Sequence, residues 1–123
     1  MKKILLIDDD EDFNESLKEY LEYKKFTVVS AYDGKQGLSL IKQEHPDLII
    51  TDIVMPEVEG IELIGQMLED SGARPPKIIA ISGGGRMGGS DYLMLAKELG
   101  AHGTFEKPLD FNLLVETIDG LLV

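Results

Sequence analysis

Leu48-Ile49-Ile50-Thr51-Asp52, followed by Ile53-Val54-Met55-Pro56-Glu57-Val58-Glu59-Gly60, has the pattern of a buried strand that ends on a carboxylate. Pro56 and Gly60 then interrupt the chain before the next helix can begin. A carboxylate at the end of a buried strand is unfavourable unless it has a partner or a function there. We therefore expect Asp52 to be a functional residue on which other polar residues converge.

Short apolar runs alternate with helical stretches on both sides of this strand. The expected strands cover residues 4–7, 27–31, 48–51, 77–82 and 104–106. Five helices are expected between and after them: one over about 11–23, a second that ends near 44, a third around 61–68, a fourth that begins at about 90 and a fifth that begins at about 110. Five βα units of this kind favour a parallel sheet with right-handed crossovers and helices on both faces. The predicted fold is a doubly wound, flavodoxin-like α/β sheet of five strands in the order 2-1-3-4-5.

The composition limits the classes of function. The 123 residues are expected to form one domain, 1–123, with no output domain attached, and 43% of them are hydrophobic. The absence of cysteine excludes disulfides and thiolate metal sites. A net charge of −11 argues against binding of nucleic acid or an anionic membrane. The first apolar run is too short for a signal peptide, so we expect a cytoplasmic protein.

Polar side chains follow the predicted strands at their carboxyl ends. Asp8 and Asp9 follow the first strand, Asp52 and Ser82 end the third and fourth, and Lys107 follows the fifth. In an open α/β sheet the functional site lies beyond these ends, where the strand order reverses. The order 2-1-3-4-5 makes strands one and three neighbours, so three carboxylates should share one cleft.

Carboxylates that lie so close remain ionised together only around a cation. Oxygen ligands without a nearby Cys or His suit a hard ion, and a shallow site of few carboxylates suits Mg²⁺. A carboxylate that attacks phosphorus forms an acyl phosphate, and the ion would bridge Asp52 to the incoming group. The Ser82 hydroxyl and the Lys107 ammonium could bind further phosphoryl oxygens. These residue types therefore favour a phosphoryl acceptor.

The chain resembles the receiver domain of two-component response regulators over nearly its whole length. The motifs that carry this resemblance are Leu6-Ile7-Asp8-Asp9, Asp52-Ile53-Val54-Met55-Pro56 with Gly60, Ala80-Ile81-Ser82-Gly83 and Lys107-Pro108. By position, the resemblance implies that Asp52 is phosphorylated, that Asp9 binds Mg²⁺ directly and Asp8 through water, and that the Val54 carbonyl is a backbone ligand. It also implies that Ser82 is the switch hydroxyl, that Lys107 is the lysine of the family, and that the Lys107–Pro108 bond is cis.

The resemblance further implies a stand-alone signalling module and not an enzyme, apart from assistance to its own phosphorylation and dephosphorylation. Its expected partners are a sensor histidine kinase or phosphotransfer protein and a downstream protein target. Two features depart from the family. First, Thr104 occupies a position that is usually Tyr or Phe in the family, and Phe105 is expected on the opposite face of the strand. Second, the loop Gly83–Gly89 is unusually rich in glycine.

Two other classes of function remain open. An aspartyl-phosphate phosphatase would use an Asp nucleophile, but it would need an acid two residues later, where this chain has Val54. A nucleotide- or flavin-binding α/β domain is suggested by the G-x-G-x-x-G match of Gly83, Gly85 and Gly88. Only one predicted strand follows that match, so half of a dinucleotide-binding fold is missing.

Overall fold

The computed structural model describes residues 2–53, 65, 75–83, 94, 97–98 and 100–122. Its strands are β1 (Lys3–Ile7), β2 (Thr27–Ala31), β3 (Leu48–Asp52), β4 (Lys77–Ser82) and β5 (Gly103–Glu106), and its helices are α1 (Glu11–Tyr23), α2 (Gly34–Glu44) and α5 (Phe111–Leu121). Most of the two predicted helices, around 61–68 and from 90, lies outside the described residues, as do the Val54 carbonyl and the predicted loop beyond Gly83. No helix within the described ranges is both long and apolar enough to cross a membrane.

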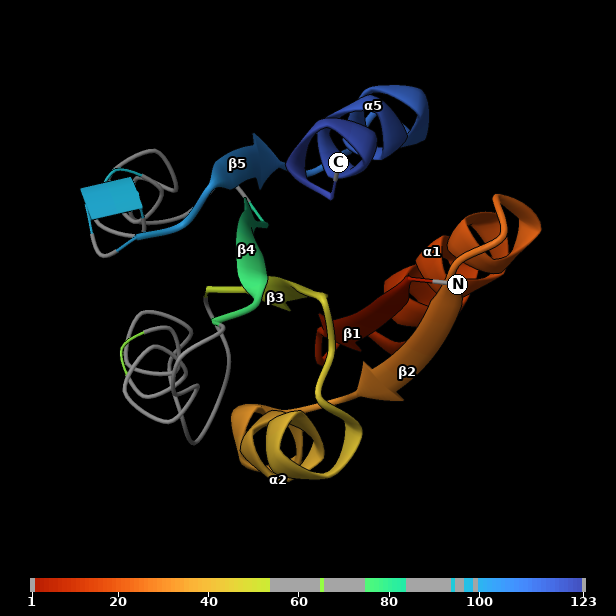
Figure 1. Cartoon of the computed structure of the whole chain (residues 1–123). Coiled ribbons are helices and arrows are strands. Elements are labelled where there is room, and N and C mark those ends of the chain that lie inside the picture. Colours follow the sequence, from red (N-terminus) through yellow and green to blue (C-terminus); the bar gives the residue numbers. More distant parts are fainter. Residues whose placement is uncertain are drawn as a thin grey trace.

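The five strands form one parallel sheet in the order β2-β1-β3-β4-β5, which confirms the predicted fold and strand order. Figure 1 shows α1 and α5 on one face of this sheet and α2 on the other. The predicted ends of three strands were wrong by one residue, because the ladder pairs Lys3 with Thr27, Asp52 with Ile81 and Gly103 with Ile79. The pairing of Asp52 makes the carboxylate residue itself part of the central strand.

Alternating side chains of the central strands divide the core into two layers. Leu5 and Ile7 of β1 are fully buried on the α2 face, whereas Ile4 and Leu6 are fully buried on the face that α1 and α5 cover. Because both faces are covered, the interior positions of β1 are all apolar, and in β3 the first polar residue is Thr51, directly before Asp52. The first residues that can present polar groups to a site are therefore those at the carboxyl ends of the strands.

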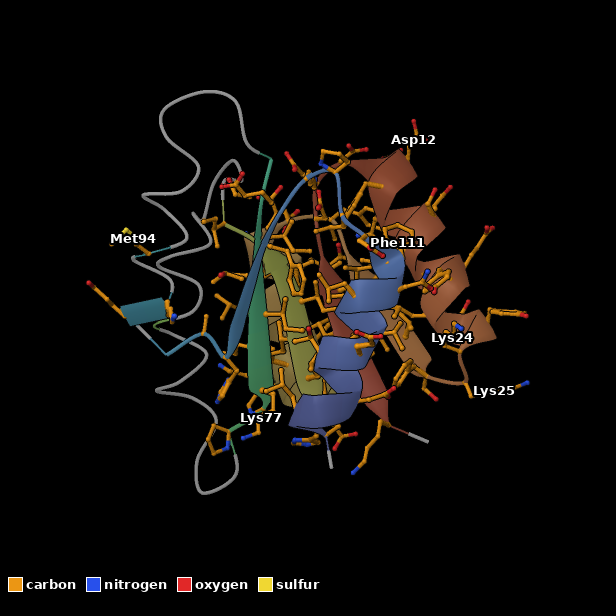
Figure 2. All side chains as sticks on the ribbon, turned by 90° about the horizontal axis from the view of Figure 1, so that it is seen from above. Asp12, Lys24, Lys25, Lys77, Met94 and Phe111 are labelled. Carbon is orange, nitrogen blue, oxygen red and sulfur yellow. The ribbon has the colours of Figure 1, made fainter. Side chains whose placement is uncertain are left out.

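Each described helix begins at an aspartate. Asp10, Asp33 and Asp110 are the N-cap residues of α1, α2 and α5, and each side chain accepts a hydrogen bond from a backbone N–H of the first turn. The helix expected from residue 110 therefore begins directly after its cap, Asp110. These caps fix the residues at which α1 and α5 begin. In Figure 2, Asp12 and Phe111, from the first turns of these helices, lie toward the end of the molecule opposite Lys77.

β5 contributes a side chain to the core layer that α1 and α5 cover, called the α1/α5 face, and it leads directly into Lys107. Phe105 packs among the buried residues of that face, as its alternation with Thr104 predicts, and Thr104 itself is half-buried. The Lys107–Pro108 peptide bond is cis, as the resemblance implies. The backbone N–H of Lys107 donates to the Ser82 carbonyl at 2.8 Å, so the ends of β4 and β5 remain joined up to the lysine.

Candidate phosphoryl-acceptor site

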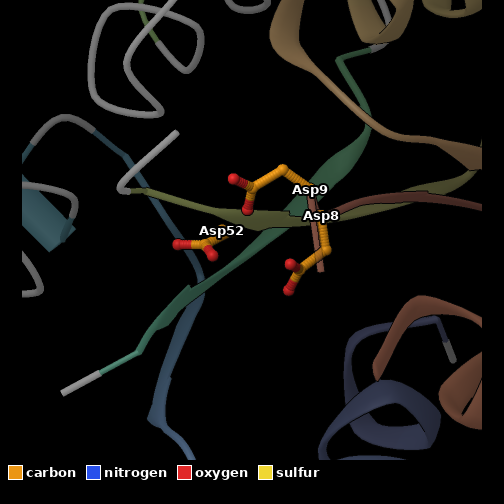
Figure 3. A group of neighbouring side chains, drawn as sticks. All are labelled: Asp8, Asp9 and Asp52. Carbon is orange, nitrogen blue, oxygen red and sulfur yellow. The ribbon is translucent and has the colours of Figure 1, made fainter. Parts of the chain in front are cut away.

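Three carboxylates gather where β1 and β3 end. Asp8, Asp9 and Asp52 each offer an oxygen within 4.8 Å of the others, and Figure 3 shows the three side chains as neighbours. The register explains this, because Ile7 pairs with Thr51 and the next residue of each strand is an aspartate. Asp8 and Asp52 are 0% and 5% exposed, whereas Asp9 is exposed. The structure therefore brings together the three acids that the sequence placed in one cleft.

Lys107 supplies the opposite charge. Its Nζ lies 2.9 Å from Asp8 Oδ2 and 3.6 Å from Asp52 Oδ2, and 17% of its side chain is exposed. Partial burial alone would lower the pKa of Lys107, but the carboxylates of Asp8, Asp52 and Asp10 outweigh burial and raise it above its usual value. The ammonium therefore remains charged between the first and third strands.

Ser82 is the last residue of β4, the strand that pairs with β3 on the side opposite β1. Asp52 pairs with Ile81 in the ladder, so Ser82 is one residue further along at the same edge of the sheet. Its side chain is buried, with 1% of the residue exposed. Of the site residues predicted from the sequence, all but Val54 lie within the described residues, and all of these lie at this one edge.

Asp8 carries a buried charge that is only partly compensated. Its Oδ1 accepts a hydrogen bond from the Asp10 N–H at 2.9 Å, but among the described residues no group donates a well-aligned hydrogen bond to its buried Oδ2, despite the nearby ammonium. Burial raises the pKa of the Asp8 carboxyl, Lys107 and the Asp10 N–H oppose this rise, and the charge of Asp9 adds to it. An oxygen-seeking cation among the three acids would supply the missing partner, so these residues fit Mg²⁺.

Asn14 is a residue of this edge that the sequence analysis missed. It is fully buried, and its Nδ2 donates to the Asp8 carbonyl at 3.1 Å and to the Ala31 carbonyl at 3.0 Å. Its Oδ1 accepts a hydrogen bond from the Ser30 hydroxyl at 2.6 Å. One side chain of α1 thus joins the ends of β1 and β2 and holds the backbone of Asp8.

A signal for Asn14 was present in the sequence. It precedes Leu17 by three residues and Leu21 by seven, so it lies on the buried face of α1. A polar residue in the apolar phase of a helix needs buried hydrogen-bond partners. The periodicity alone could not identify those partners as the carbonyls of β1 and β2.

Comparisons with known proteins agree with this geometry. Residues 4–119 match the response regulator receiver domain family. The chain is 34% identical over 122 residues to the transcriptional regulatory protein CpxR of Escherichia coli (strain K12), covering 99% of this chain and 50% of that protein. It therefore spans about half the length of this curated relative.

Solved structures give the same result. A response regulator receiver domain protein from Clostridium thermocellum superimposes with a TM-score of 0.89 at 26% identity, over 99% of this chain and 94% of the other. A CheY-like receiver domain protein from Methanospirillum hungatei JF-1 has a TM-score of 0.85 at 31% identity, over 99% and 94% of the two chains.

Proposed function

Because this chain belongs to the response regulator receiver domain family of two-component systems, we propose that Asp52 accepts a phosphoryl group from a sensor histidine kinase or phosphotransfer protein. The observation that carries this proposal is the convergence of three carboxylate residues and one ammonium at the ends of β1, β3 and β5. Asp52 is the acid of the central strand, and the partners that an incoming phosphoryl group would need surround it.

The proposed reaction is an in-line displacement at phosphorus. An Asp52 carboxylate oxygen forms the new P–O bond while the P–N bond of the donor phosphohistidine breaks. The electron pair of the breaking bond goes to the histidine ring nitrogen, and the ring takes up one proton from solvent so that it leaves as neutral imidazole. Lys107, whose Nζ lies 3.6 Å from Asp52 Oδ2, would bind one phosphoryl oxygen, and the hydroxyl of the buried Ser82 would bind another.

Asp8, Asp9 and Asp52 would hold Mg²⁺, together with the Val54 carbonyl as a proposed backbone ligand. When bound, Mg²⁺ would neutralise charge on the phosphoryl oxygens. Asp8 contributes a buried oxygen that lacks a well-aligned donor within the described part of the chain, and Asp9 contributes an exposed carboxylate at the mouth of the group. This cluster would otherwise repel the phosphoryl group, so phosphorylation is expected to require the cation.

The remaining parts of the proposal concern output. We propose that residues 1–123 act as a receiver domain that signals through contact with a downstream protein, and that the chain promotes only its own phosphorylation and dephosphorylation. A kinase partner, which draws its phosphoryl groups from ATP, makes the cytoplasm the proposed compartment. The strongly acidic surface supports a protein partner rather than nucleic acid or membrane as the target.

Incubation with acetyl phosphate, with and without Mg²⁺, followed by intact-mass measurement tests the assignment. The wild type should gain one phosphoryl group only with Mg²⁺, and Asp52→Asn should gain none. Asp12→Asn is a matched control, because Asp12 is an exposed acid in the first turn of α1 and should leave the adduct unchanged.

An adduct that persists in Asp52→Asn, or none on the wild type, would refute the proposal. Continuous release of inorganic phosphate from unrelated phosphate esters would support the phosphatase alternative instead.

A further inference from the structure

The Lys107 ammonium has a third neighbour besides the two carboxylates. Its Nζ lies 4.2 Å from the centroid of the Phe13 ring. A lysine ammonium within about 6 Å of a ring face is attracted by the negative potential of that face. The ammonium is therefore bounded by Asp8, Asp52 and an aromatic ring, and each of the three attracts positive charge.

The position of the Phe13 ring is itself constrained. Phe13 lies in the first turn of α1, and its backbone N–H donates to the side chain of the N-cap residue Asp10 at 3.2 Å. Its ring packs edge-to-face with Phe111 at the start of α5, with centroids 6.3 Å apart and planes at 74°. Phe111 in turn packs against Tyr20, with centroids 5.2 Å apart. These contacts restrict the position of the Phe13 ring.

We propose that Phe13 is a positioning residue that holds the Lys107 ammonium beside the Asp52 carboxylate. A phosphoryl group on Asp52 would then contact an ammonium whose position is already fixed. This inference rests on the proposed function of Asp52. Phe13 does not touch the reacting atoms and acts through Lys107.

The chemistry of lysine explains why such a ring matters. The lysine side chain has four rotatable bonds, and fixing them is entropically unfavourable. Lys107 Nζ is 0.7 Å nearer to Asp8 Oδ2 than to Asp52 Oδ2, from distances of 2.9 and 3.6 Å. The ring limits the orientations open to the ammonium, and it attracts the cation without neutralising it as a third carboxylate would. The positive charge therefore remains available to an incoming anion.

An aliphatic residue separates this role from simple packing. Phe13→Leu keeps an apolar side chain on α1 but removes the ring face. Phe26→Leu is the matched control, because Phe26 packs against the same α1/α5 core but precedes β2, at the opposite edge of the sheet. Phe13→Tyr keeps the ring face and is the conservative variant.

The first measurement is the rate at which acetyl phosphate phosphorylates each variant in saturating Mg²⁺. Phe13→Leu should be slower than wild type by about threefold to thirtyfold, the range expected for one cation–π contact. Phe26→Leu and Phe13→Tyr should stay within about twofold of wild type, the former even if it lowers the stability of the fold.

The second measurement is the NMR chemical shift of the Lys107 ε-methylene protons, without a phosphodonor. Protons held over the Phe13 ring face should be shifted upfield in wild type and Phe13→Tyr. They should return toward the free-lysine value in Phe13→Leu and not in Phe26→Leu. This readout reports the position of Lys107 and is insensitive to a general loss of stability.

The two measurements separate this inference from the proposed function. If wild type forms no adduct, the proposed function fails, and the Lys107 shifts still decide whether the ring holds the ammonium. If wild type reacts but Phe13→Leu matches Phe26→Leu in rate, the positioning role is refuted. Unchanged Lys107 shifts in Phe13→Leu would refute it as well.

Discussion

At the scale of single residues, Asp8 shows what a buried charge requires. Burial raises the pKa of its carboxyl, and the ammonium of Lys107 at 2.9 Å opposes this change. Removing one member of such a pair leaves the other buried without a partner, which is typically unfavourable by about 3–5 kcal/mol. Lys107 therefore helps to keep Asp8 buried, and a Lys107 variant would confound this effect with the loss of its proposed contact to a phosphoryl group. This is why Phe13, and not Lys107, is the residue to vary.

His102 supports a prediction about pH at the opposite edge of the sheet. Its Nδ1 accepts a hydrogen bond from the Ile78 N–H at 3.1 Å, near the start of β4, and only the neutral imidazole can do so. Partial burial and then the charge of Lys77 lower the pKa of His102 below its usual value of 6.5. The unfolded chain therefore binds a proton more readily than the folded one.

The stability that this hydrogen bond contributes should be fully present above about pH 6.5 and be lost as the pH falls below it, toward the lower pKa of the folded state. The loss should be at most about 1 kcal/mol, because His102 is largely exposed. Urea unfolding between about pH 5 and 8 measures it. His102→Gln keeps an acceptor that does not titrate, so wild type should weaken relative to this variant as the pH falls. A constant difference would contradict the prediction.

At the scale of elements, α2 lies unusually close to β1 at Gly37. A Cβ added there would lie 2.6 Å from Ile7 Cδ1 and 3.2 Å from Ile7 Cγ1, and Ile7 is fully buried. Gly37→Ala should therefore lower the free energy of unfolding by about 1 kcal/mol, because overpacking outweighs the better helix propensity of Ala. Gly120→Ala in α5 meets no atom within 4 Å and should instead raise it, by up to about 1 kcal/mol. Urea unfolding of the two variants tests these opposite signs, and equal signs would contradict the close approach.

Asn14 joins α1 to the ends of β1 and β2, so its loss should affect both the fold and the site. Asn14→Leu leaves the Asp8 carbonyl and the Ser30 hydroxyl without this partner, and should lower the free energy of unfolding by about 1–3 kcal/mol. Because the backbone of Asp8 is then less constrained, the variant should also bind Mg²⁺ more weakly. Urea unfolding and Mg²⁺ titration followed by NMR measure the two effects.

Ser30→Ala is the control for Asn14→Leu, because it removes the hydroxyl contact but leaves both Asn14 bonds to the strand ends. It should lose some stability and keep Mg²⁺ affinity. Loss of Mg²⁺ affinity equal to that of Asn14→Leu would show that the effect follows stability and not the position of Asp8.

The same elements show what can be predicted from sequence. Apolar runs at strand and helix spacing were sufficient to predict the strands and the described helices, because the burial pattern of each element is local and periodic. The proximity of Asp8 to Asp52 followed from strand order, since parallel strands end at one edge. The hydrogen bonds of Asn14 and the contact of Phe13 with Lys107 did not follow, because they join residues whose relative positions depend on how α1 packs on the sheet.

At the scale of the whole molecule, the negative charge has two parts: the net charge of the chain and the three carboxylates that gather at the site. A net charge of −11 destabilises a compact chain through self-repulsion, and any added salt screens part of it. The three carboxylates at the site are a separate, concentrated part of this charge. A specific effect of Mg²⁺ must therefore be measured against NaCl at matched ionic strength.

Mg²⁺ should stabilise the folded chain beyond this screening, because the unfolded chain does not hold the three carboxylates together. At a free concentration about ten times the dissociation constant, binding adds about 1.4 kcal/mol, or roughly 4–8 °C in the midpoint of thermal unfolding. Asp9→Asn should abolish the increment. Its exposed carboxylate contributes to repulsion of Asp8, so the metal-free variant should be at least as stable as wild type. Thermal unfolding by circular dichroism measures both, and an equal effect of Mg²⁺ and NaCl on wild type would mean that the carboxylates hold no ion.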